Sequence, residues 1–456
     1  MRATLAQLVA AIPGAKLVGS DVAFQGVSTD SRKVDSGALF VALRGETFDA
    51  HDFLDQVAAR GVAAVVVSQL PDGWTLPALV VPDTLVALGR IAHAWRAQFT
   101  IPVIGVTGSN GKTTVKEMIA SILAAAVGDD ARLATQGNLN NEIGVPLTLL
   151  RLDSRHRAAV VELGMNHPGE IARLAAIATP TVGMVNNAQR EHQEFMHTVE
   201  AVARENGSVL QALSADGVAV FPGDDLYTDL WRGMATCDVI TFGLTGACDV
   251  RASYTSNGFG STLQVAARGA RFDIELAAAG EHNVRNALAA IACALGAGID
   301  QDAIVRGIES FATVGGRLQC KHAANGALVI DDTYNANPDS MRAAIDVLAA
   351  YPAPRILVVG DMGEVGAQGK QFHEEIGAYA CERGIETVLA TGELARHLAP
   401  SGARHYEQFD ELLAALDDTL GGNTKTTVLV KGSRFMKMER VVAHLTGSTT
   451  IGKDAH

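Results

Sequence analysis

A glycine-rich segment between an apolar run and a predicted helix carries the residue types that hold a nucleoside triphosphate. The apolar run 103–107 leads into Gly108, Ser109, Asn110, Gly111, Lys112, Thr113 and Thr114. Glycines let backbone N–H groups close around phosphate oxygens, and the N-terminus of the following helix adds its dipole. We expect Lys112 to reach the terminal phosphates and the Thr113 hydroxyl to contact Mg²⁺. The spacing departs from the strict phosphate-loop pattern, because Val106 occupies the place of its first glycine.

Acidic and imidazole side chains follow two neighbouring apolar runs. Glu162 comes directly after the run 158–161, and His192 follows the run 181–186. In open α/β sheets, ligands bind beyond the carboxyl ends of the strands, and Mg²⁺ takes carboxylates together with phosphate oxygens. Glu162 is therefore a candidate Mg²⁺ ligand. The alternative is that a strand-end acid is simply solvated and a lone histidine lies at the surface.

Four further polar motifs stand at predicted strand or helix ends. They are Asn138-Leu139-Asn140-Asn141-Glu142, Gly280 to Asn286, Asp331 to Pro338, and Lys431-Gly432-Ser433-Arg434. Each motif has a structural explanation, either as a turn with side-chain-to-backbone bonds or as a helix cap. Their recurrence in separate units favours a second explanation, a single ligand cleft between domains.

Charge and cysteine content narrow the class of protein. The chain has 456 residues and a formal net charge of −13, which repels nucleic-acid phosphates and anionic lipid. Nucleic acid and membrane surfaces are therefore poor partners, and an anionic ligand needs a local site. The five cysteines, at positions 237, 248, 293, 320 and 381, form no C-x-x-C pair, which favours a reducing compartment. Because no apolar run is long enough to span a bilayer, we expect a cytoplasmic protein.

Strand-like and helix-like segments alternate along most of the chain. This alternation predicts an α/β protein with parallel sheets and right-handed crossovers. The pattern divides into three α/β units, residues 1–83, 84–313 and 314–456. Within the central unit, residues 253–277 alternate with period two between glycine turns, which predicts a local antiparallel sheet.

The order of the motifs resembles the Mur ligases of bacterial cell-wall synthesis, from residue 27 to residue 440. The motifs that carry the resemblance are Asp30-Ser31-Arg32, the phosphate loop, Asn138 to Pro146, Glu162-Leu163-Gly164, His282-Asn283-x-x-Asn286 and Lys431-Gly432-Ser433. The run Asp331 to Met341, with Gly360 to Glu364 and His373, resembles one member of that family. The resemblance implies a small α/β N-terminal domain, a central P-loop-type parallel-sheet ATPase domain and a Rossmann-like C-terminal domain.

For that member, the resemblance implies a ligase that uses ATP and Mg²⁺ and acts on small molecules as a monomer. The ligase would join D-alanyl-D-alanine to UDP-N-acetylmuramoyl-tripeptide through an acyl phosphate. One alternative is the sister ligase that adds the third amino acid of the peptide, although its Asp-Asn-Pro-Arg motif does not occur here. An alternative from another class is a nucleotide-dependent switch protein that hydrolyses ATP only to change shape.

Matched by position, the resemblance implies roles for individual residues. The catalytic residues would be Lys112, Glu162 and His192. The ATP contacts would come from residues 108–114, Asn286, Arg317 and Asp332. The UDP-sugar would contact Ser28, Asp30, Ser31 and Arg32. The remaining substrate contacts would be Asn140, Asn141, Glu142, Tyr334, Asn335, Asn337 and Lys431.

One departure from the family concerns the metal. Many Mur ligases carry, beyond the residue that matches His192, a lysine whose carbamate binds a second Mg²⁺. Here Asn206 stands at that position, and no lysine occurs between Lys116 and Lys321. We expect the neighbouring Glu205 to supply the negative charge, the alternative being that Glu205 is a solvated helix residue. The expected metal ligands are thus Thr113, Glu162, His192 and Glu205.

Overall fold

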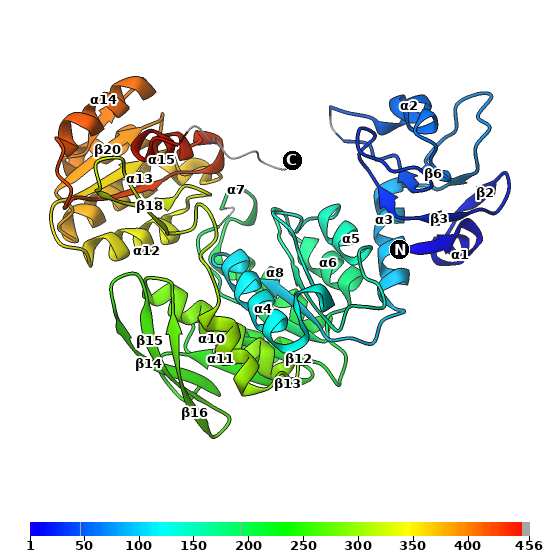
Figure 1. Cartoon of the computed structure of the whole chain (residues 1–456), viewed down its shortest axis with the longest axis horizontal. Coiled ribbons are helices and arrows are strands. Elements are labelled where there is room, and N and C mark those ends of the chain that lie inside the picture. Colours follow the sequence, from blue (N-terminus) through cyan, green and yellow to red (C-terminus); the bar gives the residue numbers. More distant parts are fainter. Residues whose placement is uncertain (46, 192, 449–456) are drawn as a thin grey trace.

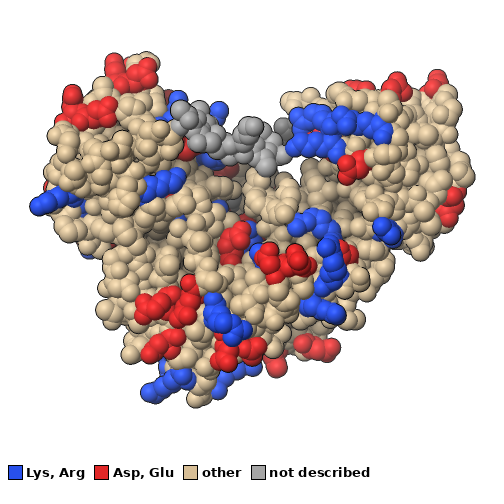
Figure 2. Space-filling model, viewed as in Figure 1, with Lys and Arg blue, Asp and Glu red and all other residues tan. Residues whose placement is uncertain are grey.

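The computed structural model describes residues 1–45, 47–191 and 193–448, and three main sheets follow one another along this chain. Figure 1 shows the N-terminal domain in blue, the central domain in cyan and green, and the C-terminal domain in yellow to red. The N- and C-terminal domains form two lobes on either side of a notch above the central domain (Figures 1 and 2). On the face drawn in Figure 2, acidic and basic side chains form small interspersed groups.

The N-terminal domain is built on a five-stranded sheet in the order β2-β7-β6-β5-β4. Strands β4 to β7 run parallel and β2 is antiparallel to β7. The strands are β2 (Lys16–Val18), β4 (Val27–Ser28), β5 (Leu39–Val41), β6 (Ala64–Val67) and β7 (Ala78–Val80), with a separate antiparallel pair β1 (Arg2–Thr4) and β3 (Ala23–Gln25). The helices are α1 (Leu5–Ala11), η1 (Ala50–Phe53) and α2 (Leu54–Ala59). The polar segment that follows β4 therefore lies at the carboxyl edge of this sheet.

The central domain contains a nine-stranded sheet in the order β16-β15-β14-β13-β12-β11-β8-β10-β9. Its strands are β8 (Val103–Thr107), β9 (Arg132–Ala134), β10 (Ala158–Glu162), β11 (Val182–Val185), β12 (Val218–Pro222), β13 (Asp238–Gly243), β14 (Val250–Ser256), β15 (Ser261–Ala267) and β16 (Ala270–Leu276). Strands β8 to β14 run parallel, whereas β14, β15 and β16 pair antiparallel. Strands β8, β10 and β11 are buried throughout, which explains their continuous apolar runs.

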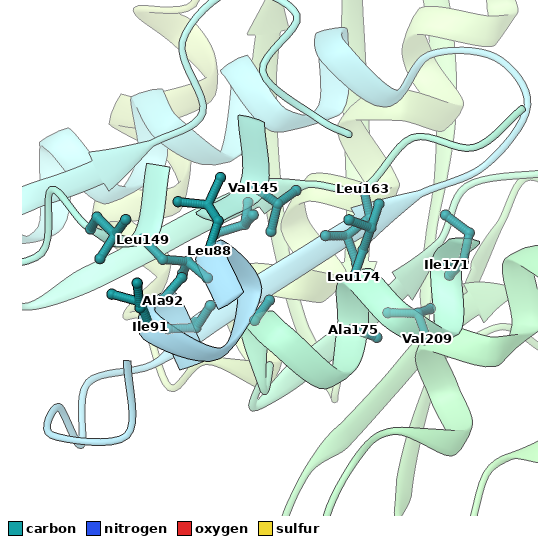
Figure 3. Packing of buried hydrophobic residues seen from close by; sticks show 14 of the residues in the cluster. Leu88, Ile91, Ala92, Val145, Leu149, Leu163, Ile171, Leu174, Ala175 and Val209 are labelled. Carbon is teal, nitrogen blue, oxygen red and sulfur yellow. The ribbon is translucent and has the colours of Figure 1, made fainter. Parts of the chain in front are cut away.

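Helices cover both faces of the central sheet. One apolar core contains α3 (Thr84–Arg96), α5 (Gly144–Leu149), α6 (Glu170–Ala178), α8 (Val199–Gln211) and α9 (Thr228–Met234); the other contains α4 (Lys112–Val127), α10 (Glu281–Gly296) and α11 (Gln301–Glu309). Figure 3 shows Leu88 and Ile91 of α3 packed beside Val145 and Leu149 of α5. The same core continues into the N-terminal domain through residues such as Leu5 and Leu79. Short helices η2 (Asp129–Ala131) and α7 (Gln193–Met196) complete the domain.

The C-terminal domain has a six-stranded sheet in the order β17-β18-β22-β19-β20-β21, in which β17 pairs antiparallel with β18 and the remaining pairs are parallel. The strands are β17 (Gln319–His322), β18 (Leu328–Asp332), β19 (Arg355–Val359), β20 (Thr387–Thr391), β21 (Arg404–Tyr406) and β22 (Thr427–Lys431). The helices are α12 (Pro338–Ala349), η3 (Gly366–Gln368), α13 (Gly369–Glu382), η4 (Ala395–Ser401), α14 (Phe409–Leu420), η5 (Arg434–Met436) and α15 (Glu439–Thr446). Helices α12 and α13 pack on one face of the sheet, and α14 and α15 on the other.

The predicted α/β class with three domains is confirmed, as is the local antiparallel sheet, which is β14 to β16. The expected limits at residues 83 and 313 both fall between sheets. The five cysteines are free thiols. Within the described part of the chain, none of the helices is long and apolar enough to cross a membrane.

Candidate nucleotide and substrate site

A cavity of about 840 Å³ lies where the central and C-terminal domains meet. Its walls include the carboxyl ends of β8, β10 and β12 from the central sheet, and those of β18 and β22 from the C-terminal sheet. Parallel sheets place ligand sites at these edges because loops and helix N-termini converge there. The predicted polar motifs are therefore expected to line this cavity.

The phosphate loop crosses the floor of this cavity between β8 and α4. Gly108 has φ 136° and Gly111 has φ 82°, a range that favours glycine. A Cβ at Gly111 would also lie 2.4 Å from Oδ1 of Asn286 and 2.6 Å from Nδ2 of Asn186. The loop therefore requires glycine at this position both for its backbone angle and for close packing. Ser109, Asn110, Thr113 and Thr114 also line the cavity.

The ammonium group of Lys112 is folded back onto its own loop. It donates to the carbonyl oxygens of Gly108 at 2.6 Å and Ser109 at 3.1 Å, and it forms an ion pair with Oε1 of Glu191 at 2.9 Å. A lysine ammonium has three N–H donors, so all three are occupied in this arrangement. A phosphate oxygen that binds Lys112 must displace at least one of these partners.

Glu162 and Thr113 meet beneath the phosphate loop. The Thr113 hydroxyl donates to Oε1 of Glu162 at 3.1 Å, and Nδ2 of Asn140 donates to the same oxygen at 2.9 Å. Glu162 is 2% exposed, and its Oε2 has no hydrogen-bond partner among the described residues. An unpaired buried carboxylate oxygen beside a phosphate loop fits a divalent cation, because Mg²⁺ binds hydroxyl, carboxylate and phosphate oxygens. These residues therefore fit the expected Mg²⁺, while His192 lies outside the described residues.

Residues 186–191, which follow β11, hold the phosphate loop from the side. The Ser109 N–H donates to the Asn187 carbonyl at 3.2 Å, and the Asn110 N–H donates to Oδ1 of Asn187 at 2.9 Å. The Gln189 N–H donates to the Ser109 hydroxyl at 2.9 Å. From this part of the chain, the sequence analysis singled out only His192 and missed the contacts of residues 186–191. The available signal was the pair of asparagines directly after a buried strand.

Asn286 reaches the cavity from α10 and lies against the phosphate loop. It is 4% exposed, accepts a hydrogen bond from Nδ2 of Asn186 at 2.9 Å and donates to Oδ1 of Asn283 at 3.1 Å. These bonds orient its amide beside Gly111. Contact with adenine stays a prediction for this residue. His282, one turn earlier, also lines the cavity, and burial lowers the pKa of its imidazole.

The C-terminal domain contributes cationic groups to the same cavity. Arg317 donates from NH2 to the Thr113 hydroxyl at 2.9 Å, and its guanidinium lies 4.0 Å from the ring centroid of Tyr334. Lys431, at the end of β22, donates to Oδ2 of Asp332 at 2.6 Å and to the Asn335 carbonyl at 2.9 Å. The structure thus brings Arg317, Asp332, Tyr334, Asn335 and Lys431 together around one cavity, and their contacts with nucleotide or dipeptide stay predictions.

A second set of contacts joins the two domains directly. Asn337 caps the N-terminus of α12, and its Nδ2 donates to Oδ1 of Asn110 in the phosphate loop at 2.9 Å. Arg190 binds Asp339 through three N–H groups and binds Glu375 through two. Burial would lower the pKa of the Arg190 guanidinium, but its hydrogen bonds with the two carboxylates raise the pKa instead.

The amide-rich segment before α5 combines structural and site roles. Asn140 lines the cavity and binds Glu162, as described above. Oδ1 of Asn141 accepts from the backbone N–H groups of residues 143 and 144, which is the turn with side-chain-to-backbone bonds considered from the sequence. Glu142 lines the cavity rim and pairs with Arg173 on α6 at 2.5 Å.

The Asp-Ser-Arg motif lies in the N-terminal domain and is not among the residues that line the cavity. Asp30 and Arg32 form a bidentate pair at 2.9 and 3.1 Å, and the hydrogen bonds from Arg32 lower the pKa of the Asp30 carboxyl. The Ser28 hydroxyl contacts the backbone of Asp30, while Ser31 is buried. The side chain of Arg32 is 75% exposed.

The contacts of Glu205 do not support the expected metal role. Both of its carboxylate oxygens accept backbone N–H groups at the start of α6, from Gly169 and Ile171 at 2.8 Å each. A carboxylate at a helix N-terminus satisfies free N–H groups and complements the helix dipole. Asn206 is fully buried and accepts from the Thr107 hydroxyl at 2.8 Å. We therefore assign Glu205 to capping α6 and do not carry it into the metal site.

Three family models match the sequence in succession. Residues 23–96 match the Mur ligase family catalytic domain, residues 106–294 the Mur ligase middle domain, and residues 316–434 the Mur ligase glutamate ligase domain. Two curated relatives, both UDP-N-acetylmuramoyl-tripeptide–D-alanyl-D-alanine ligases, are each 40% identical to this chain. The alignment with the Haemophilus influenzae protein covers 96% of this chain and 97% of that one, and the alignment with the Escherichia coli protein covers 97% and 98%.

Two solved MurF structures superpose on more than nine tenths of the chain. A crystal structure of MurF from Acinetobacter baumannii has a TM-score of 0.93 at 36% identity, covering 98% of this chain and 99% of that one. A structure of MurF ligase from Thermotoga maritima in complex with ADP has a TM-score of 0.83 at 27% identity, covering 93% and 97%.

The fold and the site define a three-domain α/β nucleotide-binding enzyme whose phosphate loop faces a second domain across a cleft. The chain belongs to the Mur ligase family. Within that family, the two curated relatives described above are named UDP-N-acetylmuramoyl-tripeptide–D-alanyl-D-alanine ligases. The resemblance drawn from the sequence motifs is thereby confirmed.

Proposed function

We propose that this protein is an ATP-dependent ligase that joins D-alanyl-D-alanine to UDP-N-acetylmuramoyl-tripeptide in the synthesis of peptidoglycan precursors. Its relatives of that name align over nearly the full length of the chain. The observation that carries the proposal is the convergence of Lys112, Thr113 and Glu162 from one domain with Arg317 and Lys431 from another around one cavity.

The reaction takes place in two steps that need the same positive site. A tripeptide carboxylate oxygen attacks the γ-phosphorus of ATP, the bond from that phosphorus to the β,γ-bridging oxygen breaks, and ADP leaves. The amine of the dipeptide then attacks the carbonyl carbon of the acyl phosphate, loses a proton, and inorganic phosphate departs. Both anions of the first step must approach each other, so their repulsion has to be offset by fixed positive charge.

Lys112 and Arg317 supply that charge from two domains. The Lys112 ammonium lies at the phosphate loop, and the Arg317 guanidinium is fixed between the Thr113 hydroxyl and the Tyr334 ring. Because Arg317 belongs to the C-terminal domain, its place beside the phosphate loop depends on how that domain packs. Positioning that holds the attacking oxygen in line with the bond that breaks at the γ-phosphorus contributes much of the rate enhancement in phosphoryl transfer.

Mg²⁺ would be held by Thr113 and Glu162, with His192 as a further predicted ligand. The ion would neutralise charge on the phosphate oxygens. The donor set supports this, because Oε2 of Glu162 is buried and has no partner among the described residues. The protein residues then orient the nucleotide through the phosphate-loop N–H groups and keep Glu162 in place through Asn140.

The substrates are assigned to separate surfaces. Ser28, Asp30, Ser31 and Arg32 are proposed to contact the UDP-sugar on the N-terminal domain, where the exposed Arg32 can pair with a phosphate. Tyr334, Asn335, Asn337 and Lys431 are proposed to lie near the incoming dipeptide or the nucleotide. We further propose that the enzyme acts in the cytoplasm, because ATP and UDP-linked precursors are small soluble substrates, and that it acts as a monomer.

The proposal is tested by mass spectrometry of the product. The full chain is incubated with ATP, Mg²⁺, D-alanyl-D-alanine and UDP-muramoyl-tripeptide, and the expected product is the UDP-pentapeptide with one ADP per bond formed. Incubation with UDP-muramoyl-dipeptide and single amino acids tests the sister ligase. Phosphate release without the peptide or without the amine would point to the switch protein instead and would overturn the proposal.

A further inference from the structure

The carboxylate of Glu191 pairs with Lys112, the residue that is expected to reach the terminal phosphates of ATP. It lies 2.9 Å from the Lys112 ammonium, its side chain is 12% exposed, and it lines the cavity. None of the roles assigned above uses this residue. A buried acid beside a phosphate-binding lysine is unexpected, because a carboxylate and a phosphate repel each other at this range.

The backbone at Glu191 is fixed by its neighbours. Arg190 is bound to Asp339 and Glu375 of the C-terminal domain through its N–H groups, and Gln189 is bound to Ser109 of the phosphate loop. These contacts hold the backbone of residues 189 and 190 beside the phosphate loop. A rotation of the Glu191 side chain alone would therefore release Lys112 and keep the carboxylate close to the loop.

A cation between a carboxylate and a polyphosphate offsets the repulsion between the two anions. Mg²⁺ commonly takes one or two carboxylates together with phosphate oxygens and waters. Glu162 supplies one carboxylate, which binds Thr113 of the phosphate loop, and Glu191 supplies a second, which binds Lys112. Glu162 and Glu191 thus come from different elements and line the same cavity.

We propose that Glu191 is a carboxylate ligand of the divalent cation that accompanies ATP, and that it covers Lys112 when no nucleotide is bound. The inference rests on the proposed use of ATP and Mg²⁺. Glu191 would supply the negative charge that was expected at the metal from Glu205. Glu205 does not supply it, because its carboxylate caps α6. Glu191 would move from Lys112 to the cation as the phosphates arrive.

The proposal predicts how strongly metal and nucleotide promote each other's binding. The affinity of the full-length protein for a non-hydrolysable ATP analogue is measured by calorimetry with EDTA and again with saturating Mn²⁺. The ratio of the two dissociation constants is the gain due to metal. In Glu191→Gln this gain should fall about tenfold or more, since even residues behind metal ligands change metal affinity 10- to 100-fold. Glu191→Asp should keep part of it.

The control is Glu194→Gln, which removes the same charge from an exposed position three residues along the chain. That variant should keep the wild-type gain, and the electron paramagnetic resonance signal of bound Mn²⁺ should change only in the Glu191 variants. Binding of the analogue in EDTA shows that each variant is folded. If Glu191→Gln binds the analogue more tightly in EDTA yet keeps the full gain from Mn²⁺, Glu191 only covers Lys112 and the proposal is overturned. These measurements need no ligation, so failure of the proposed reaction would be seen separately.

Discussion

Arg190 of the central domain and Asp339 of the C-terminal domain form a bidentate ion pair, with the shortest N···O distance at 2.6 Å. The Arg190 backbone N–H donates to the same carboxylate at 2.8 Å, and the guanidinium also binds Glu375 at 2.7 Å. Arg190 is adjacent to Glu191 in sequence, so this pair links the placement of the C-terminal domain to the phosphate loop.

Breaking this pair should weaken nucleotide binding without unfolding the protein. Arg190→Gln and Asp339→Asn should each raise the Michaelis constant for ATP about tenfold, in line with the loss of one partly buried charge-assisted pair. The double variant should be no worse than the worse single variant, because both substitutions remove the same Arg190–Asp339 interaction. Purely additive effects in steady-state kinetics would show that the two residues act independently.

Lys112→Ala should leave the fold intact and reduce ligation severely. The ammonium is expected to stabilise charge that moves onto the β,γ-bridging oxygen, and the loss of one such contact costs about 10²–10³ in rate. Turnover is measured by product mass, and folding by circular dichroism. Near-normal turnover in a folded variant would contradict the assignment of the phosphate loop.

Arg32→Ala should weaken binding of the UDP-peptide and leave ATP binding nearly unchanged. Arg32 is exposed, is oriented by Asp30, and does not line the cavity that holds the phosphate loop. Michaelis constants for both substrates provide the test, with Lys33→Ala as a control for the loss of a neighbouring positive charge. A change mainly in the constant for ATP would remove the UDP-sugar from this surface.

Glu205→Gln should lower stability and leave the Mg²⁺ requirement unchanged. The substitution replaces an oxygen acceptor by an amide NH₂ that faces a backbone N–H, at a cost of about 1–3 kcal/mol. Urea unfolding should show a lower midpoint, and the Mg²⁺ dependence of turnover should match the wild type. A raised Mg²⁺ requirement at unchanged stability would return Glu205 to the metal site.

The buried imidazole of His373 should make stability depend on pH. Its Nε2 accepts the Met362 N–H at 3.1 Å, its Nδ1 lies 2.7 Å from the Gly369 carbonyl, and burial lowers its pKa below the ordinary 6.5. Because the folded pKa is depressed, the stabilisation is complete above about pH 6.5 and is lost as the pH falls below it. His373→Gln, which keeps an acceptor, should show a smaller drop in urea midpoint between about pH 7.5 and 5.5. An equal drop in both proteins would assign the dependence to other groups.

Local sequence patterns were sufficient for the fold class and for the phosphate loop. The buried runs of β8, β10 and β11, the glycines at 108 and 111 and the helix after Lys112 each depend on neighbouring residues only. The apolar pattern of a short run and the backbone angles open to glycine are local properties, so these elements and the strand-end position of Glu162 could be predicted. The turn at Asn141, held by its side-chain bonds to the backbone, was one of the two explanations considered for that motif.

Contacts between distant segments were decided by the tertiary structure alone. The sequence placed Glu205 beside the metal because its neighbour matched a family lysine. Helix packing instead directs the Glu205 carboxylate to Gly169 at the start of α6, which lies 36 residues earlier in the sequence. Glu191 and Arg190 carried no motif, and their partners Lys112 and Asp339 are 79 and 149 residues distant. A side chain's type and spacing determine what chemistry it is capable of, whereas the packing of helices and domains determines which partner it meets.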